Sequence, residues 1–325
     1  PPAWAPARAG GGWQISGAVT HGGYFCTRCF CPQASSKSGV GFKPGGSLRG
    51  NMFRRAMTER DMDRMVTLFV TAAERCYDAG FDAVEIHMGH GYLLNQFLSP
   101  LDNQRADAYG GSAENRARFP ARVLKAVKEA VGDRIAVLAK INVADGRSKG
   151  AQLEDGVITA KILEQAGADM LVLSGGRNVE SGWFTFGSNM NLEAMLRVLG
   201  KWSLSGMAIA STQAAVPKIE FKELYFWEYS TKIREAVDLP LAYLGGVKSA
   251  DNVAQCMDAG FEAVQLARAL LREPDLVNRW REEGGQSLCD NCNSCVAYIY
   301  HPAGTWCIQR PANVLEDNQV WASAG

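Results

Sequence analysis

Ala79-Gly80-Phe81-Asp82-Ala83-Val84 joins the end of a predicted helix to the start of a short apolar strand. The same junction recurs at residues 166–171 (AGADML) and at residues 259–264 (AGFEAV). Strands that alternate with helices imply right-handed crossovers and a parallel sheet. Repetition of one such unit favours a closed (β/α) barrel over a doubly wound sheet. No Gly-x-Gly-x-x-Gly follows a predicted strand, which weakens the dinucleotide-binding alternative.

The predicted strands are short and rich in Val, Ile, Leu and Ala, the composition of a sheet buried on both faces. A (β/α)8 TIM barrel requires eight of them. The chain supplies six candidates and begins Pro1-Pro2 rather than with Met, so we expect the first two strands of the barrel to be absent from it. The six strands are predicted at residues 13–19, 82–87, 135–141, 169–174, 240–244 and 263–267.

Composition supports an ordinary folded protein. The 325 residues include 34 Lys and Arg against 34 Asp and Glu, and 47% are hydrophobic. That apolar content argues against disorder, the balanced charge argues against a nucleic-acid partner, and no apolar run reaches the roughly 18 residues of a membrane span. We divide the chain into an irregular segment (1–12), the barrel (13–282) and a Cys-rich segment with a tail (283–325). Without a signal peptide, we expect a cytoplasmic protein.

Three of the four histidines follow predicted strands, where barrel enzymes carry their catalytic residues. His21 follows the first strand, and His87-x-x-His90-x-Tyr92 follows the second. The functional interpretation of His87, His90 and Tyr92 is a pair of imidazoles that bind a carbonyl or an anion, beside a phenol that donates a proton. The alternative is that these histidines only satisfy backbone groups at a strand end. A zinc site is a weaker interpretation.

Basic and glycine residues follow the other strands. Gly245-Gly246 precedes a helix that begins near residue 250, and Ala267-Arg268 follows the last strand. Glycines allow close backbone approach and helix N–H groups face anions, so this pair of loops predicts a phosphate-bearing cofactor. Lys140 lies within an apolar strand, so it needs an anionic partner such as a charged cofactor. A lysine that extends to solvent from the strand end is the alternative.

Cysteines form the densest ligand pattern in the chain. Cys289, Cys292, Cys295 and Cys307 match either an iron–sulfur cubane or a structural zinc. A close triplet followed by a remote fourth cysteine favours iron–sulfur, and free thiols are the third alternative. The cysteines at positions 26, 29 and 31 lack a nearby fourth ligand, so we interpret them as loop thiols.

Two motifs point to a family. Residues 85–100 (EIHMGHGYLLNQFLSP) and 107–116 (DAYGGSAENR) closely resemble the old yellow enzyme family of FMN-dependent NADH:flavin oxidoreductases. The likeness extends through the Lys140 strand and residues 245–246 to residues 267–271 (ARALL). The Cys-rich segment is similar to the branch that contains 2,4-dienoyl-CoA reductase and trimethylamine dehydrogenase, which carry a four-iron (4Fe-4S) cluster at this place.

The resemblance implies roles for the marked residues. FMN would lie across the barrel mouth, with Lys140 at flavin N1 and C2=O. Gly245, Gly246, Ala267 and Arg268 would hold its phosphate. His87 and His90 would bind the substrate carbonyl oxygen, flavin N5 would deliver hydride to an activated C=C bond, and Tyr92 would protonate the other carbon. The four-iron cluster would exchange single electrons with FMN. Electrons would come from NAD(P)H or from an electron-transfer protein. The sequence leaves homo-oligomer formation open.

The sequence departs from the family at two places. Ala18 stands where the family has a flavin-contacting Gln, and Ala267-Arg268 replaces Gly-Arg. Two other functions remain open. One is oxidative amine dealkylation on the same cofactors, with Trp183 and its aromatic neighbours binding the substrate cation. The other is a non-catalytic, incomplete barrel with zinc on its four cysteines.

Overall fold

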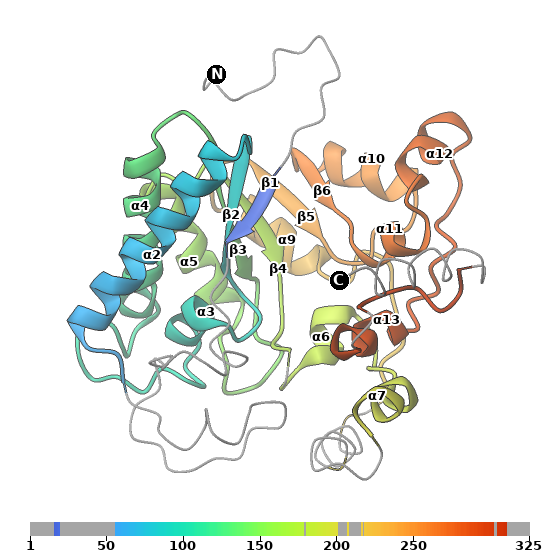
Figure 1. Ribbon diagram of the computed structural model, residues 1–325, viewed down its shortest axis with the longest axis horizontal. Helices are drawn as coiled ribbons and strands as arrows, with labels where there is room; N and C mark the ends of the chain where they lie inside the picture. Colours follow the sequence, from blue (N-terminus) through green and yellow to red (C-terminus); the bar gives the residue numbers. More distant parts are fainter. Residues whose placement is uncertain are drawn as a thin grey trace.

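Six parallel strands form one sheet in chain order within the part of the chain that is described. The computed structural model describes residues 16–19, 56–178, 180–200, 207, 216, 218–301 and 304–310. All six predicted strands are present, and no strand end differs from its prediction by more than three residues. Figure 1 shows them at the centre of the molecule. The strands are β1 Ser16–Val19, β2 Ala83–Met88, β3 Ala136–Asn142, β4 Met170–Ser174, β5 Leu241–Leu244 and β6 Ala263–Gln265.

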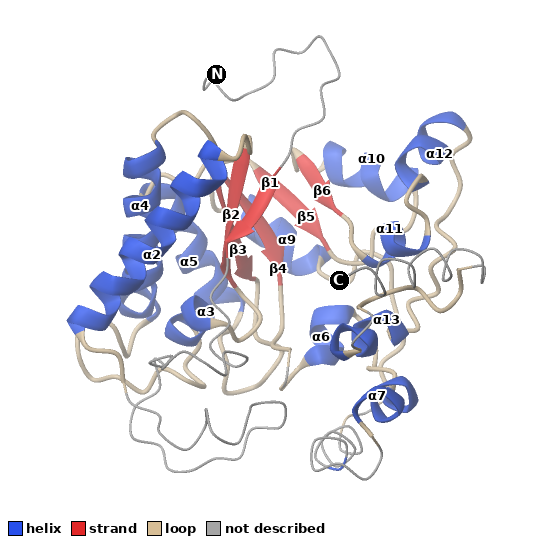
Figure 2. Ribbon diagram, viewed as in Figure 1, coloured by secondary structure: helices blue, strands red, loops and turns tan. Residues whose placement is uncertain are grey.

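Helices follow the strands and cover the outside of the sheet (Figure 2). This alternation is the architecture of a (β/α)8 TIM barrel. None of the helices in the described ranges is long and apolar enough to cross a membrane. The helices are α2 Glu59–Asp78, α3 Leu93–Leu98, α4 Ala113–Val131, α5 Leu153–Gln165, α6 Gly182–Phe186, α7 Leu192–Leu199, α9 Trp227–Arg234, α10 Ala250–Asp258, α11 Arg268–Arg272, α12 Leu276–Glu282, α13 Ser294–Ala297 and the 3-10 turn η1 Tyr298–Tyr300.

The three repeated junctions share one backbone conformation. Gly80, Gly167 and Gly260 have φ angles of +85°, +92° and +86°. Each follows the last turn of α2, α5 or α10, where a left-handed residue ends a helix with little strain only if it lacks a Cβ atom. The chain then turns directly into β2, β4 or β6. The repeat therefore encodes the helix-to-strand turn that builds the barrel.

Strand register separates an apolar outer face from a polar inner face. Parallel pairing places His87 of β2 beside Lys140 of β3, and Asn142 of β3 beside Ser174 of β4. Because side chains alternate along a strand, Val84 and Ile86 lie on the opposite face from His87, and both are buried in the main hydrophobic core. Polar side chains from several strands therefore meet inside the sheet, at the carboxyl ends of the strands.

Candidate active site

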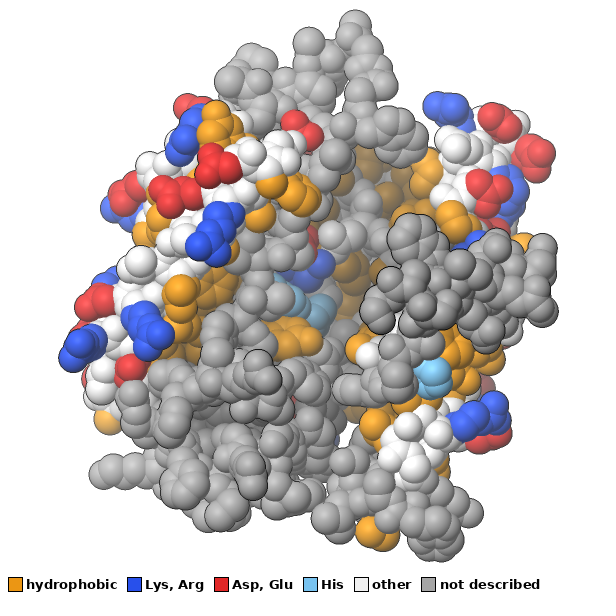
Figure 3. All heavy atoms as spheres, in the orientation of Figure 1, with side chains coloured by type: hydrophobic (Ala, Val, Ile, Leu, Met, Phe, Trp, Pro, Cys, Tyr) orange, Lys and Arg blue, Asp and Glu red, His pale blue; other side chains and the backbone are white. Residues whose placement is uncertain are grey.

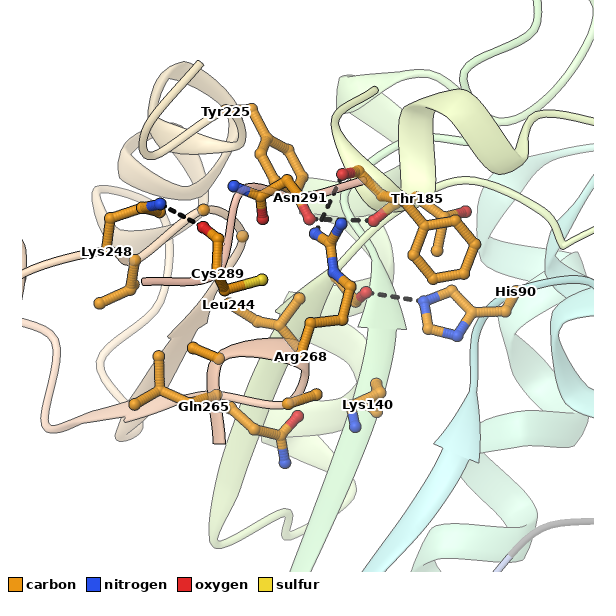
Figure 4. Close-up of a pocket in the computed structure, with 18 of the residues that line it drawn as sticks. His90, Lys140, Thr185, Tyr225, Leu244, Lys248, Gln265, Arg268, Cys289 and Asn291 are labelled. Atoms are coloured by element: carbon orange, nitrogen blue, oxygen red, sulfur yellow. Dashed lines mark hydrogen bonds between the residues drawn. The ribbon is translucent and has the colours of Figure 1, made fainter. Parts of the chain in front are cut away.

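A cavity of about 470 Å³ lies at the carboxyl ends of β2 to β6. Figure 4 shows side chains from these strands and from the loops that follow them arranged around it. On the face of the molecule seen in Figure 3, His and basic side chains gather in a central hollow. The volume is in the range of small-molecule and cofactor sites, and the position is the one at which barrel enzymes place their active sites.

His87, His90 and Tyr92 lie together beside this cavity. The ring centroids of His87 and His90 are 4.9 Å apart, and the ring of Tyr92 is also 4.9 Å from that of His87. The Nε2 atom of His90 is 2.7 Å from the Oγ atom of Ser174, and His90 itself lines the cavity. The structure thus brings together the three residues that the sequence marked as catalytic.

Both imidazoles are held in the neutral form. Burial and, secondarily, the positive charge of Lys140 lower the pKa of His87 to about 3. Burial, the neighbouring His87 and Lys140 also lower the pKa of His90 well below its usual value. The Nδ1 atom of His87 accepts a hydrogen bond from the Gly89 amide over 3.2 Å. In a neutral imidazole the other nitrogen then carries the proton, so His87 can act as a donor through Nε2–H.

The backbone of His90 is fixed in an uncommon conformation. Its φ angle is +60°, which non-glycine residues rarely adopt. The Asn142 side chain accepts from the His90 amide over 3.1 Å, and its Nδ2 atom donates to the Gly176 carbonyl over 2.8 Å. The backbone carbonyl of His90 accepts a hydrogen bond from the backbone N–H of Asn178 over 3.2 Å. Asn142, at the end of β3, therefore joins the loops after β2 and β4.

The Tyr92 phenol is hydrogen-bonded by a residue that sequence reasoning did not find. The Nδ2 atom of Asn178 donates to the Tyr92 oxygen over 3.1 Å. Burial raises the pKa of Tyr92, and the hydrogen bond from Asn178 opposes that rise. Because the phenol oxygen accepts this bond, its own hydrogen remains available to another acceptor.

Arg177 anchors the turn that carries Asn178. Its side chain is fully buried and forms an ion pair with the buried Asp102. The Nε atom of Arg177 lies 3.3 Å from a carboxylate oxygen of Glu180, and its Nη1 atom donates to the Oδ1 atom of Asn95 over 3.4 Å. A buried charge needs such partners. Arg177 therefore holds the turn after β4 against residues that follow β2.

Lys140 is paired with Glu85, a partner that the sequence analysis did not name. The Nζ atom of Lys140 is 2.7 Å from the Oε1 atom of Glu85. The other carboxylate oxygen accepts from the Nε2 atom of Gln265 over 3.2 Å. All three side chains line the cavity. Alternation along β2 was the available signal, because it places Glu85 on the same face as His87.

The glycine loop and Arg268 form the other end of the cavity. Gly246 has a φ angle of +76°, and a Cβ atom there would lie 2.8 Å from the backbone nitrogen of Leu224. The Nη2 atom of Arg268 donates to the Phe186 carbonyl over 3.0 Å, and its Nη1 atom contacts the Asn293 side chain. Lys248 adds a second cation to the wall. The predicted phosphate-binding residues 245, 246, 267 and 268 are therefore all in one wall.

The four C-terminal cysteines line a second, smaller cavity. Cys289, Cys292, Cys295 and Cys307 all belong to its wall, and none of them forms a disulfide. Burial raises the pKa of Cys295 to about 11, and the other three thiols add to that rise. Among the described residues, no set of three or more His, Cys, Asp or Glu side chains is arranged to hold a metal ion.

The two cavities share part of their walls. Arg268, Cys289 and Asn291 line both. Figure 4 shows the side chains of Arg268 and Cys289 among those around the larger cavity. The Lys248 ammonium also contacts the Cys289 carbonyl, so the glycine loop after β5 and the Cys-rich segment are in direct contact.

Some of the residues singled out from the sequence lie outside the described residues or away from the larger cavity. His21 and the cysteines at 26, 29 and 31 lie outside the described residues, and of Ala18 only the backbone in β1 is described. Trp183 lies in α6, with its ring 5.7 Å from that of Phe184. It is not among the residues that line the larger cavity. Two other residues of the same stretch, Thr185 and Phe186, do line that cavity.

The chain is similar in sequence to known flavin oxidoreductases and their relatives. The model of the family described as NADH:flavin oxidoreductase / NADH oxidase matches residues 22–183. A 4,4'-dithiodibutanoate disulfide reductase from Rhodococcus erythropolis is 39% identical over 265 residues, which cover 81% of this chain and 65% of that protein. An NADH oxidase from Thermoanaerobacter brockii is 28% identical, over 74% of this chain and 32% of its own length.

Among solved structures, histamine dehydrogenase from Rhizobium sp. 4-9 is similar with a TM-score of 0.63 and 23% identity, over 83% of this chain and 34% of that one. This likeness shows the barrel fold. The chain thus spans about two thirds of the disulfide reductase and about a third of the other two proteins.

Proposed function

Because the chain belongs to the NADH:flavin oxidoreductase / NADH oxidase family, we propose that it is an FMN-dependent oxidoreductase that reduces an activated C=C bond. NAD(P)H or a protein donor supplies the electrons. The observation that carries this proposal is the cluster of two neutral histidines and a phenol beside a cavity with a cationic end. It resembles the set that the family uses on a carbonyl-conjugated alkene.

The residues around the cavity fit FMN. Gly246 lines the cavity with main-chain atoms alone, because the place of a Cβ atom is taken by the backbone of Leu224 and the ring of Tyr225, and such a backbone could face a phosphate. Arg268 and Lys248 offer positive charge at the same end. Lys140 and Gln265 offer a donor and an acceptor at the other end, for the polar edge of the flavin ring. FMN, when bound, would supply the hydride.

His87 and His90 would bind the carbonyl oxygen of the substrate. His87 is neutral and carries its proton on Nε2, so it can donate a hydrogen bond without giving up its proton. Hydrogen bonds to that oxygen draw electron density from the conjugated alkene and make its far carbon electrophilic. Lys140 adds a fixed positive charge nearby, because its side chain is held by Glu85.

Tyr92 would donate the proton that completes the reduction. Reduction of a C=C bond needs one hydride on the far carbon and one proton on the carbon beside the carbonyl. The Tyr92 oxygen accepts from Asn178, so its own hydrogen is free to point to the substrate. Burial keeps the phenol protonated at neutral pH because it raises the pKa.

The four cysteines would hold a 4Fe-4S cluster once the cluster draws their thiols together, since among the described residues they are not arranged around a metal ion. They line one small cavity, and its wall meets the wall of the proposed FMN site at Cys289 and Arg268. Such contact suits transfer of single electrons between the two cofactors. Zinc in place of iron is the alternative that the same thiols permit.

Reduction of a disulfide is the second candidate, and the relative from Rhodococcus erythropolis favours it. In this reaction hydride equivalents break the S–S bond, one thiol forms directly, and the departing thiolate takes a proton. Tyr92 could supply that proton from the same position, so the site chemistry needs no further group. The two candidates differ in whether the acceptor is carbon or sulfur.

The absorption spectrum of the purified protein, with iron and acid-labile sulfide analysis, tests the cofactors. Flavin bands with a broad iron–sulfur shoulder support the proposal, whereas a colourless, zinc-containing protein contradicts it. Steady-state assays with NADH or NADPH and either 2-cyclohexenone or 4,4'-dithiodibutanoate then separate the candidates. Turnover of the enone supports C=C reduction, and turnover of the disulfide alone replaces that proposal with the second candidate.

A further inference from the structure

Gln265 of β6 has a buried hydrogen-bond acceptor that no described group satisfies. Its Nε2 atom donates to the Oε2 atom of Glu85 over 3.2 Å. Its Oε1 atom is buried, and none of the described donors reaches it. Buried side-chain oxygens nearly always have a partner in native proteins. Gln265 also lines the larger cavity, so a ligand there is a natural source of the missing donor.

The orientation of the amide follows from Glu85. Turning the amide over would bring its oxygen against the carboxylate, and two acceptors would then face each other without a proton between them. The nitrogen must therefore face Glu85, and the oxygen is the group left without a partner. The missing group is consequently a hydrogen-bond donor.

Lys140 places a fixed donor next to this acceptor. Its ammonium contacts the Oε1 atom of Glu85 over 2.7 Å, while Gln265 contacts the Oε2 atom of the same carboxylate. Figure 4 shows the Gln265 and Lys140 side chains projecting into the same part of the cavity. One carboxylate thus positions an ammonium donor and an amide acceptor side by side. That pair is complementary to a ligand edge on which a carbonyl oxygen adjoins an N–H group, as in a cyclic imide.

We propose that Gln265 is a cofactor-binding residue whose Oε1 atom accepts a hydrogen bond from the imide N3–H of FMN. This inference rests on the proposed function. In the isoalloxazine ring the C2 carbonyl adjoins N3–H, so a ring that presents C2=O to Lys140 presents N3–H to the neighbouring acceptor. The phosphate would then lie toward the cationic end of the cavity, at Arg268 and Lys248.

The position of Ala18 agrees with this assignment. Ala18 of β1 pairs in register with Glu85, and an alanine has no amide to offer there. Gln265 reaches the same Glu85 from β6. The chain thus has an amide on another strand, at the carboxylate of the residue that pairs with Ala18 in the backbone register.

The test compares FMN with 3-methyl-FMN, which lacks the N3–H group. Each is titrated into the full-length protein freed of flavin, and binding is followed by quenching of flavin fluorescence. The wild-type protein should bind FMN about tenfold more tightly than 3-methyl-FMN, the ratio expected for one hydrogen bond of ordinary strength. In Gln265→Met this ratio should fall to about one, because FMN binding weakens while 3-methyl-FMN binding does not.

Controls keep the outcomes distinct. Gln255→Met alters an exposed glutamine on α10, outside the cavity, and should keep the wild-type ratio. The ratio is measured within each protein, and Gln265→Leu provides a second variant if Gln265→Met does not fold. FMN binding by Gln265→Met with the wild-type ratio would overturn the role of Gln265 alone. A wild-type protein that binds neither flavin would overturn the proposed function as well.

Discussion

The amide of Asn178 donates a hydrogen bond to the phenol oxygen of Tyr92 over 3.1 Å. Asn178 lies in the turn after β4, and Tyr92 immediately precedes α3. The bond therefore orients the Tyr92 phenol from a different loop. The bond also opposes the rise in the Tyr92 pKa that burial causes. Asn178 thus determines both the direction in which the phenol hydrogen points and the ease with which it leaves.

Reversing the polarity of this bond should slow proton donation. In Asn178→Asp the carboxylate accepts the phenol hydrogen and raises the pKa of Tyr92, so the hydrogen is withheld from the substrate. We expect the rate of substrate reduction to fall by more than about tenfold, the value of one ordinary hydrogen bond, and by less in Asn178→Ala. Stopped-flow reoxidation of the reduced enzyme measures this rate. Similar rates in both variants and the wild type would exclude the bond from the reaction.

Removal of the phenol itself should affect only one half of the reaction. Tyr92→Phe deletes the proposed proton donor and keeps the ring that packs on His87. We expect substrate reduction to slow by about 10²–10⁴-fold, the usual value of general acid catalysis, while reduction of the flavin by NAD(P)H is unchanged. Stopped-flow traces of the two half-reactions provide the comparison. Equal losses in both would remove Tyr92 from the proton-donor role.

The Lys140–Glu85 ion pair should be costly to break from one side. Both side chains are largely buried, so Lys140→Met leaves the Glu85 carboxylate without its ammonium partner. We expect the free energy of unfolding to fall by about 3–5 kcal/mol. Urea denaturation measures it. Adding Glu85→Gln to this variant should restore most of the loss, because no unpaired charge then remains.

An exposed pair provides the matched control. Lys125 and Glu129 lie on the surface of α4 with their charged atoms 3.9 Å apart. Lys125→Met should change the free energy of unfolding by less than about 1 kcal/mol. Losses of the same size for Lys140→Met and Lys125→Met would show that the buried pair contributes no more than a surface pair.

Stability should depend on pH through His87. The pKa of His87 is lowered to about 3 in the folded protein, whereas its ordinary value is 6.5. Between these values the unfolded chain binds a proton that the folded chain does not, so the stability falls as the pH decreases from 6.5 toward 3. His87→Asn should reduce that loss by up to about 1.4 kcal/mol per pH unit. Urea denaturation between pH 4 and pH 7 tests this, with His301→Asn as control. Parallel curves for His87→Asn and the wild type would contradict it.

The barrel was predictable because its signals are local. Each described strand is a short, largely apolar run. Three of the six follow a left-handed turn at Gly80, Gly167 or Gly260, which requires only the glycine present there. The proximity of the proposed catalytic residues was predictable for a similar reason. His87, His90 and Tyr92 lie within six residues, so one strand end and one turn bring them together.

The partners of these residues were not predictable, because they come from distant parts of the chain. Glu85 and Gln265 meet across the sheet interior, and strand register and tilt decide that contact. Asn178 reaches Tyr92 from the turn after β4, next to Arg177, which is buried against Asp102. A single sequence records which residues face inward, through alternation along strands, but not which inward residues touch.

Arg268 couples binding in the two cavities, because its side chain lines both of them. One guanidinium holds Phe186 on one side and Asn293 on the other, while its side chain lines both spaces. An occupant of one cavity that interacts with the Arg268 charge would change how strongly that charge attracts an occupant of the other cavity. Binding at two coupled sites is reciprocal. If an occupant of the cysteine cavity changes the affinity for flavin by some factor, flavin changes the affinity for that occupant by the same factor. Assembly of the holoenzyme would then be a linked equilibrium rather than two independent loadings.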